Sequence, residues 1–204
     1  MDIVLATRNR KKIQEMRKIL KDGGVHNLNV LTLDDFPDCP EVIEDGETFE
    51  ANAVKKAVHI CRCTGLTAIA DDSGLEVDAL NGAPGVWSAR YAGESADDAA
   101  NLEKLLDGMK GVAPVNRGAR FVCCIAMASG EDVRTFRGYV EGGIGTGPRG
   151  ENGFGYDPVF YPEGNDRTFA EMSDKEKNAI SHRARALEAL QRYLLEEKES
   201  PKKL

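Results

Sequence analysis

The sequence lacks an apolar run long enough to cross a membrane, and it lacks an excess of positive charge. Its 204 residues carry 27 Lys and Arg against 34 Asp and Glu, which gives a formal net charge of −7. This balance disfavours a general nucleic-acid binder and a protein that binds anionic membranes. The sequence shows no signal-peptide pattern, so we expect a cytoplasmic protein without a membrane or nucleic-acid partner.

Several sequence motifs are also missing. There is no CxxC pair and no P-loop motif, and we see neither an internal repeat nor a Pro/Ser-rich linker. We therefore expect one domain over residues 1–199, followed by a frayed tail at residues 200–204. Cysteines are few and odd in number, which in a cytoplasmic chain predicts free thiols; they are Cys39, Cys61, Cys63, Cys123 and Cys124.

Strand-like and helix-like segments alternate along the chain, which predicts an α/β fold. Short apolar strands are expected at Asp2–Thr7 and Val30–Leu33, and a long antiparallel hairpin is expected over Arg120–Val140. Helical periodicity predicts helices after Arg8 up to Gly23-Gly24, over Thr48–Cys61, from Ser95 to Leu106, and in a closing segment to about Glu197.

The stretch Ala70-Asp71-Asp72-Ser73-Gly74 is the centre of this pattern. It follows the apolar run Leu66–Ala70, and Ser73-Gly74 is expected to turn the chain before a further strand at Leu75–Ala79. Two carboxylates at a strand end must reach water or a cation, because unpartnered buried charges are costly. The pair therefore predicts either a metal or ligand site or a solvated turn.

Basic residues follow the first strand at Thr7-Arg8-Asn9-Arg10-Lys11-Lys12. A strand, a tight turn and a helix start form a natural anion site, since free backbone N–H groups and the helix dipole converge there. A capped helix with a solvated basic turn is equally compatible with these residues. Lys55 and Lys56 present a similar choice between a phosphate contact and a solvated pair.

Seven glycines between Gly142 and Gly155 lead into the aromatic turn Phe154-Gly155-Tyr156-Asp157-Pro158. Such a turn suits stacking against a planar ligand. The alternative is a hairpin corner in which the aromatic rings fill the core. His182, in Ser181-His182-Arg183, is one of three histidines in the chain, and its polar neighbours argue against a core role.

Taken in order, seven blocks of residues resemble a known family, the noncanonical purine nucleoside triphosphate pyrophosphatases, also called inosine triphosphate pyrophosphatases. The blocks are Thr7-x-Asn9-x-x-Lys12, Glu44-Asp45-Gly46-x-Thr48-Phe49, Ala70-Asp71-Asp72-Ser73-Gly74-Leu75, Gly82-Ala83-Pro84-Gly85, Ser88-Ala89-Arg90-Tyr91, Gly153-Phe154-Gly155-Tyr156-Asp157-Pro158 and Ser181-His182-Arg183. The resemblance implies a long mixed central sheet flanked by helices, with two lobes around a nucleotide cleft, and a homodimer. It also implies Mg²⁺-dependent hydrolysis of ITP, dITP and XTP to the monophosphate and pyrophosphate.

The resemblance assigns roles residue by residue. Asp72 would be the catalytic base, and Glu44 and Asp72 would ligate Mg²⁺, with Asp71 supporting the acidic cluster. Substrate contacts would come from Thr7, Arg8, Asn9, Arg10, Lys11, Lys12, Lys56 and Arg90 on the phosphates, and from Ser73, Phe154, Gly155, Tyr156, Asp157, Lys177, His182 and Arg183 on the rest of the nucleotide. The family often has glycine where this chain has Arg8, so either the geometry of the first turn differs or a positive charge is added there.

Three other functions are alternatives to this one. A pyrophosphatase for pyrimidine or methylated nucleotides, of the septum-formation-inhibitor type, is the nearest enzymatic alternative. His182-Arg183 and the Phe154–Asp157 turn favour a purine. A non-catalytic nucleotide sensor is disfavoured by the set of Glu44, Asp72 and Lys12. A haloacid-dehalogenase-type phosphatase needs an Asp-x-Asp nucleophile motif, which Asp71-Asp72-Ser73 does not supply.

Overall fold

The computed structural model describes residues 1–22 and 28–199, which form two compact units. Unit 1 combines residues 1–72, residues 123–138 and the chain from Arg183 onward. Unit 2 combines residues 73–122 and 139–182. The expected helix stop at Gly23-Gly24 and the expected tail at residues 200–204 lie outside the described residues.

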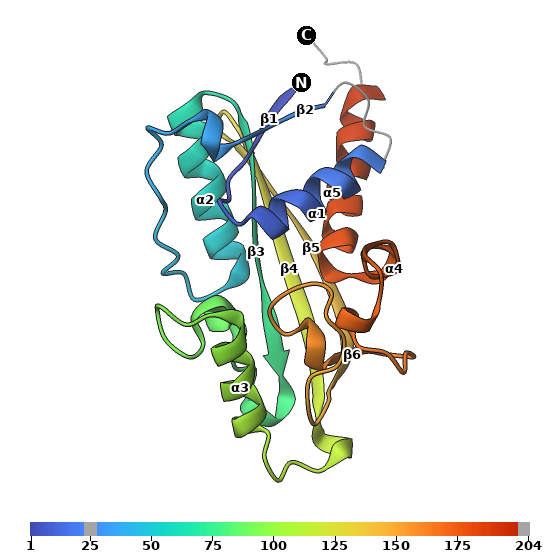
Figure 1. Ribbon diagram of the computed structural model, residues 1–204. Helices are drawn as coiled ribbons and strands as arrows, with labels where there is room; N and C mark the ends of the chain where they lie inside the picture. The colour runs from blue at the N-terminus through green and yellow to red at the C-terminus, as the bar shows by residue number, and fades with distance from the viewer. Residues whose placement is uncertain (23–27, 200–204) are drawn as a thin grey trace. The chain divides into compact units, whose positions relative to one another are not determined.

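Six strands form one sheet in the order β2-β1-β3-β4-β5-β6 (Figure 1). They are β1 (Asp2–Leu5), β2 (Asn29–Thr32), β3 (Thr67–Val77), β4 (Gly118–Ser129), β5 (Asp132–Ile144) and β6 (Phe160–Pro162). Strand β1 pairs in parallel with β2 and β3, whereas β5 pairs antiparallel with β6. The prediction of a mixed sheet in an α/β fold is confirmed.

The α-helices are α1 (Arg10–Asp22), α2 (Phe49–Thr64), α3 (Asp98–Gly108), α4 (Asp174–Ile180) and α5 (His182–Glu199). Thr48 caps α2 by accepting a hydrogen bond from the N–H of Ala51, and Ser173 caps α4 in a capping box. Helix α3 begins at Asp98, three residues after the predicted start at Ser95, and Asp97 caps it. Among the described residues, no helix combines the length and apolar character that a membrane span requires.

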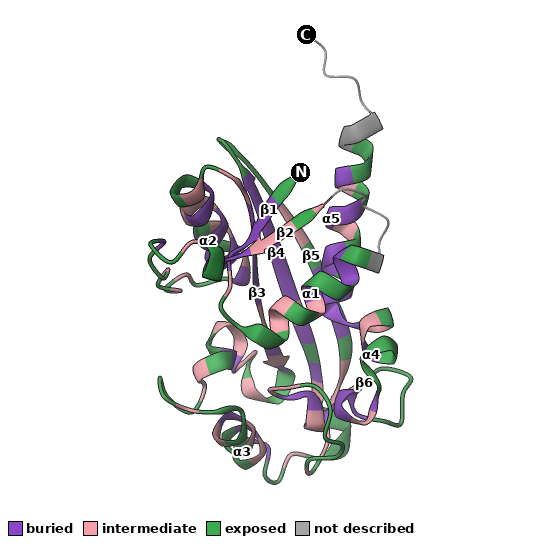
Figure 2. Cartoon of the chain, turned by 45° about the horizontal axis from the view of Figure 1, so that its top comes forward, coloured by how far each residue is buried: buried purple, intermediate pink, exposed green. Residues whose placement is uncertain are grey.

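In unit 1, helices α1 and α5 share a core with one face of the strands. Ile3, Leu5 and Ile69 belong to this core together with Met16 of α1 and Leu187 of α5. Successive residues of a strand point to opposite faces, so this core lies on the face of β3 that carries odd-numbered residues. Figure 2 shows β3 and β4 buried along most of their length.

Unit 2 has its own core, built around three phenylalanines. Phe121, Phe160 and Phe169 lie with ring centroids 4.7 to 6.0 Å apart. Aromatic rings at these separations contribute beyond their buried area. The core fixes the strand ends and the turns that carry the unit's candidate site residues.

The structure corrects the predicted turn at Ser73-Gly74. Strand β3 runs without interruption from Thr67 to Val77, through both aspartates and through Gly74. The turn-like composition is misleading because residues on both faces of this strand are buried, before and after Ser73, so tertiary packing holds the chain extended. Asp71 and Asp72 therefore lie inside a strand and not at its end.

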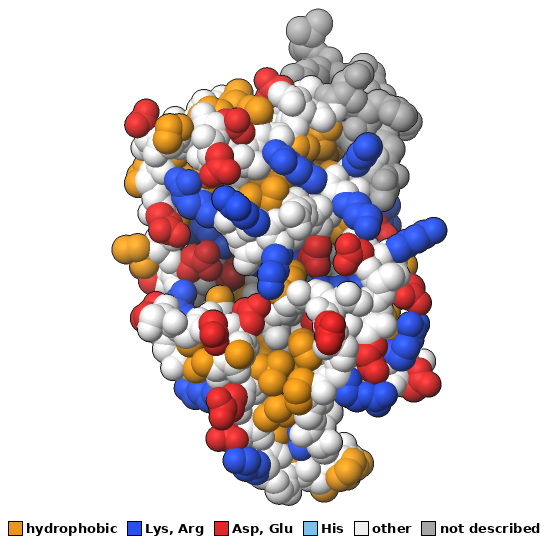
Figure 3. Space-filling model, viewed as in Figure 1, with side chains coloured by type: hydrophobic (Ala, Val, Ile, Leu, Met, Phe, Trp, Pro, Cys, Tyr) orange, Lys and Arg blue, Asp and Glu red, His pale blue; other side chains and the backbone are white. Residues whose placement is uncertain are grey.

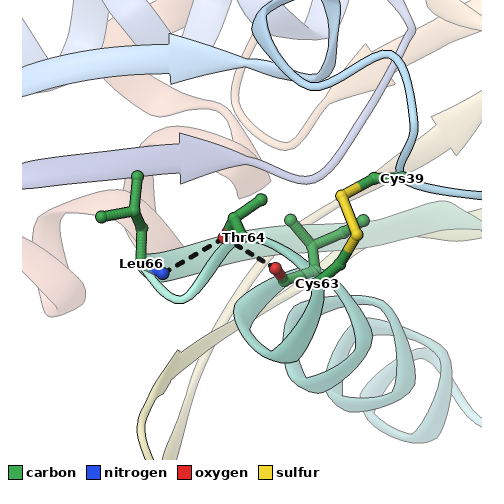
Figure 4. The surroundings of a disulfide bond; sticks show 5 residues. Cys39, Cys63, Thr64 and Leu66 are labelled. Atoms are coloured by element: carbon green, nitrogen blue, oxygen red, sulfur yellow. Dashed lines mark hydrogen bonds between the residues drawn. A yellow bond between two sulfur atoms is a disulfide. The ribbon is translucent and has the colours of Figure 1, made fainter.

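The expectation of free thiols is wrong for two cysteines. Cys39, in the loop before α2, forms a disulfide with Cys63 near the end of that helix (Figure 4). Cys61, Cys123 and Cys124 are free and buried, as expected. Beyond Cys63 the helix ends at Gly65, which adopts the left-handed conformation that glycine accommodates without a steric penalty.

Candidate functional site

Two adjacent aspartates of β3 face opposite sides of the strand. Asp71 lies on the same face of β3 as Ile69, and it forms ion pairs with Lys12 of α1 and Arg183 of α5. Asp72 lies on the opposite face and accepts a hydrogen bond from Asn52 of α2. The alternation of a strand thus assigns the two carboxylates to different surroundings within unit 1.

Asp71 is fully buried and surrounded by cations. Its Oδ2 atom lies 3.1 Å from the Lys12 ammonium and 3.3 Å from both Nε and Nη2 of Arg183. Burial alone would raise the pKa of this carboxyl, but the charges of Lys12, Arg183 and Lys56 outweigh it and hold the pKa well below its usual range. Asp71 therefore stays ionised at neutral pH.

Asp72 is also buried, but its pKa moves the other way. Burial is the largest cause and raises the pKa; the Glu44 carboxylate adds to the rise, while Lys56, Lys12 and the Asn52 hydrogen bond oppose it. A carboxylate with a raised pKa is a better proton acceptor than one held by strong ion pairs. Of the two aspartates, Asp72 has the properties of a general base.

Lys56 stands between the acidic residues of unit 1. Its ammonium is 2.7 Å from Glu44 Oε1 and 2.7 Å from the backbone oxygen of Asp71. Burial would lower the pKa of Lys56, but Asp71, Glu44 and Asp72 raise it, so the side chain stays charged. Lys55 instead pairs with Asp45 at the surface, so of the two neighbouring lysines it is Lys56 that points inward.

Sequence reasoning missed Asn52. Its side chain is buried and contacts both Asp72 and Gly46. The signal was present in the sequence: Asn52 and Lys56 occupy the same helix face as Phe49 and Ala53, where a polar side chain interrupts an apolar stripe. Polar residues on a buried face need partners, and here the partners are the candidate site itself.

The donor set of unit 1 fits a hard divalent cation. Glu44 pairs with the Lys56 ammonium at 2.7 Å, and the charges of Glu44 and Asp72 act on each other and on that ammonium, so the two carboxylates lie in one neighbourhood. Mg²⁺ prefers oxygen ligands and is held through one or two carboxylates together with phosphate oxygens and water. Within residues 1–22 and 28–199, no three His, Cys, Asp or Glu side chains gather into a metal site on their own. A metal here would therefore depend on the substrate for further ligands.

The first turn is a capped helix start. Asn9 Oδ1 accepts hydrogen bonds from the N–H groups of Lys11 and Lys12, and Thr7 Oγ1 accepts one from the N–H of Asn9. Arg8 is outside the left-handed region, since Asn81 is the non-glycine residue with positive φ in the described chain. Glycine is therefore not required at position 8. Figure 3 shows Lys and Arg side chains over this part of unit 1, beside acidic ones.

Arg183 is one of the most buried side chains of unit 1. Besides Asp71, its guanidinium donates to the carboxylate of Glu15 on α1. The positive charge of Arg183 is therefore neutralised inside unit 1 by carboxylates of α1 and β3. Glu15 is a second residue that sequence reasoning missed, because it reads as an ordinary solvated position of an amphipathic helix.

In unit 2, the aromatic turn is tied to α4. Lys177 Nζ lies 2.7 Å from Asp157 Oδ2, and both side chains are buried. The same oxygen accepts the N–H of Phe154, and the Lys177 ammonium lies 4.9 Å from the centroid of the Phe154 ring. Phe154, Asp157 and Lys177 therefore form one connected group. Gly155 adjoins it, with its N–H donating to Asp98.

The remaining candidates of unit 2 are Tyr156, His182, Arg90 and Ser73, and their surroundings differ. Tyr156 is buried in the core and donates its hydroxyl to the backbone oxygen of Ser88, so this ring follows the core-filling alternative. His182 is buried and stacks on Phe121 of the core with ring centroids 4.7 Å apart, so the expectation that its polar neighbours argue against a core role is wrong. Arg90 lies over the ring of Trp87 and 3.6 Å from Glu94, while Ser73 is half-buried on β3.

Comparison with known proteins gives a consistent result. A family model described as the Ham1 family matches residues 3–193. A Bacillus licheniformis protein named dITP/XTP pyrophosphatase is 50% identical over 194 residues, which cover 95% of this chain and 97% of its own.

Two solved structures are similar to the whole chain. The Staphylococcus aureus Ham1 protein has a TM-score of 0.86 at 43% identity, covering 97% of this chain and 100% of its own. A HAM1 protein from Coxiella burnetii has a TM-score of 0.87 at 44% identity, covering 96% and 99%.

Proposed function

Since the chain belongs to the Ham1 family, we propose that it hydrolyses noncanonical purine nucleoside triphosphates to the monophosphate and pyrophosphate. ITP, dITP and XTP are the proposed substrates, in keeping with the name dITP/XTP pyrophosphatase that its relatives carry. The observation that supports this most directly is the pairing of Glu44 with Lys56, next to the buried Asp72 that Asn52 links to the same loop. It brings together carboxylates for a metal and a cation for phosphate oxygens.

The residues of unit 1 carry the phosphate chemistry in this proposal. Lys12, Lys56 and the exposed basic residues of the first turn neutralise the triphosphate, since phosphoryl transfer depends mainly on positioning and charge neutralisation. Glu44 and Asp72 would hold Mg²⁺, and the ion would supply polarisation of a bound phosphate and acidification of water. Asp72 accepts the proton of the water that cleaves the bond between the α and β phosphates. Its raised pKa supports that role.

The residues of unit 2 contact the base and sugar in this proposal. Lys177 and His182 are the donors for the 6-oxo group of the purine, and Phe154 offers an aromatic face. Arg183, which the resemblance assigned to the base, is held by Asp71 and Glu15 within unit 1. A donor that meets the amino group of adenine is left unpaired, which disfavours ATP. Arg90 and Ser73 complete the substrate contacts.

A substrate panel tests the function. Pyrophosphate release is measured for ITP, dITP, XTP, ATP, GTP and methylated or pyrimidine triphosphates, each with Mg²⁺ and with EDTA. We expect turnover of ITP, dITP and XTP with Mg²⁺, little turnover of ATP, and none with EDTA. Preferred turnover of pyrimidine or methylated nucleotides would replace this function with the alternative, and binding without turnover would make the protein a sensor.

We further propose a cytoplasmic homodimer. Light scattering coupled to size exclusion should then give twice the chain mass of 22.2 kDa. A mass of one chain would contradict the dimer without affecting the proposed chemistry.

A further inference from the structure

The loop that carries Glu44 is fastened to helix α2 along its length. This loop, residues 36–47, contacts the helix in reverse order: Cys39 with Cys63, Glu44 with Lys56, Asp45 with Lys55 and Gly46 with Asn52. It therefore runs antiparallel to α2, beside which it is seen in Figure 1. The position of Glu44 is set by the helix and not by the loop alone.

Asn52 makes the last of these contacts, and it is the one that also reaches β3. Its Oδ1 accepts the N–H of Gly46 at 2.7 Å, and its Nδ2 donates to Asp72 Oδ2 at 3.0 Å and to the backbone oxygen of Gly46 at 3.4 Å. One buried amide thus joins the loop of one candidate metal ligand to the carboxylate of the other.

The orientation of this amide follows from its partners. With the amide reversed, its oxygen would face the Asp72 carboxylate and its NH₂ group would face the Gly46 N–H, which gives two repulsive contacts. The side chain is 1% exposed, so water does not compete for these bonds. The two bonds to Gly46 fix the amide against the loop, and its bond to Oδ2 restrains the Asp72 carboxylate relative to that loop.

Resting on the proposed function, we propose that Asn52 is a positioning residue that sets the separation of Asp72 and Glu44 and orients Asp72 for metal binding and proton transfer. It touches neither metal nor substrate and acts through the two carboxylates. Groups that orient metal ligands are typically worth about 10–100-fold in metal affinity or activity. An effect of that size separates this role from a purely structural one.

Two variants disturb the contact from its two sides. Asn52→Ala removes the amide. Gly46→Ala keeps it, but the added Cβ would lie 2.7 Å from Asn52 Oδ1, so the loop must shift away. Gln191→Ala is the matched control, because Gln191 is equally buried in unit 1 and its amide donates to the backbone oxygen of Ile19, on α1. It removes a buried side-chain hydrogen bond without touching Asp72 or the loop.

The experiment measures Mn²⁺ binding to the protein in the presence of pyrophosphate, by loss of the free-ion EPR signal relative to pyrophosphate alone. It also measures the Mg²⁺ concentration for half-maximal ITP turnover, and kcat and KM at saturating Mg²⁺. Thermal unfolding followed by circular dichroism verifies that each variant is folded. For Asn52→Ala we expect metal affinity and kcat to fall about 10–100-fold, with KM for ITP changing less than kcat. Gly46→Ala should change in the same direction, and Gln191→Ala should stay within about twofold of wild type.

The possible outcomes distinguish this inference from the proposed function. Values for Asn52→Ala within twofold of Gln191→Ala would reduce Asn52 to a structural residue. If Asn52→Ala does not fold, Gly46→Ala decides the question, and unchanged metal binding there overturns the inference. A wild-type protein that binds Mn²⁺ but does not hydrolyse ITP would refute the function, and the EPR comparison would still test Asn52.

Discussion

Asp71 and Asp72 are neighbours in the sequence, yet their surroundings assign them opposite tasks. Asp71 is neutralised by Lys12 and Arg183, whereas Asp72 has a raised pKa and sits beside Glu44 and Asn52. Replacing either aspartate by asparagine keeps the shape of the side chain but removes its charge, and it should therefore have different effects at the two positions. At position 72 it should affect activity, and at position 71 it should affect stability.

For Asp72→Asn we expect pyrophosphate release to fall by about 10²–10⁴-fold or more, because the change removes the proposed base and a metal ligand together. The unfolding temperature should stay close to that of wild type, since a buried carboxylate with a raised pKa is itself unfavourable when ionised. Steady-state kinetics with ITP and a thermal melt measure both. Turnover within a few-fold of wild type would remove Asp72 from the chemistry.

For Asp71→Asn we expect a loss of about 3–5 kcal/mol in the free energy of unfolding, because Arg183 and Lys12 lose their shared partner in a buried site. The effect depends on pH in a defined direction. The pKa of Asp71 is depressed on folding, so its stabilisation is complete above the unfolded pKa of about 3.9 and is lost as pH falls toward the folded pKa.

Urea unfolding of both proteins between pH 7 and pH 3 measures this difference. Below about pH 4 the wild type should lose stability by up to about 1.4 kcal/mol per pH unit from this one group, and Asp71→Asn should lack that contribution. Parallel curves for the two proteins would show that Asp71 is not the group that stabilises unit 1.

At the scale of elements, sequence patterns predicted the helices better than the strand at the centre of the site. The helix predicted from Thr48 begins there with Thr48 as its cap, because a capping signal depends only on residues a few positions apart. The break expected at Ser73-Gly74 failed because tertiary burial of β3 overrides local turn composition. The candidate site roles of Lys56 and Asn52 differ from those of their neighbours because these two side chains lie on the buried face of α2.

The disulfide gives α2 and the Glu44 loop a measurable link. Cys39 and Cys63 are 24 positions apart. Closing a loop of this length lowers the conformational entropy of the unfolded chain, which raises the free energy of unfolding by about 3 kcal/mol. Reduction with dithiothreitol should therefore lower the unfolding temperature by about 6–12 °C. Cys39→Ser should melt at the lower temperature with or without reductant. An unchanged melting temperature on reduction of the wild type would show that the bond does not constrain this protein.

At the scale of the whole molecule, the family was predictable because its residue blocks occur in order along nearly the whole chain. The resemblance implied two lobes, but the boundaries of the two units were not predictable, because strands β3, β4 and β5 each contribute residues to both. Pairing of Arg183 with Glu15 joins positions 168 residues apart, and no local pattern signals it. Long-range ion pairs of this kind follow from the fold and not from the sequence motif.

Ligand binding should raise the stability of the whole folded chain. The net charge is −7, so affinity for a phosphate ligand must come from local basic groups and a metal ion and not from the overall charge. These groups are gathered only in the folded state, and a ligand that binds this state alone raises stability by about 2.7 kcal/mol at 100 times its Kd. Mg²⁺ with pyrophosphate should therefore raise the unfolding temperature by about 5–10 °C. Adding EDTA should reverse most of the shift, and Asp72→Asn should show a smaller one. An equal shift with EDTA would mean that pyrophosphate binds without the metal, which would contradict the assignment of Glu44 and Asp72 as its ligands.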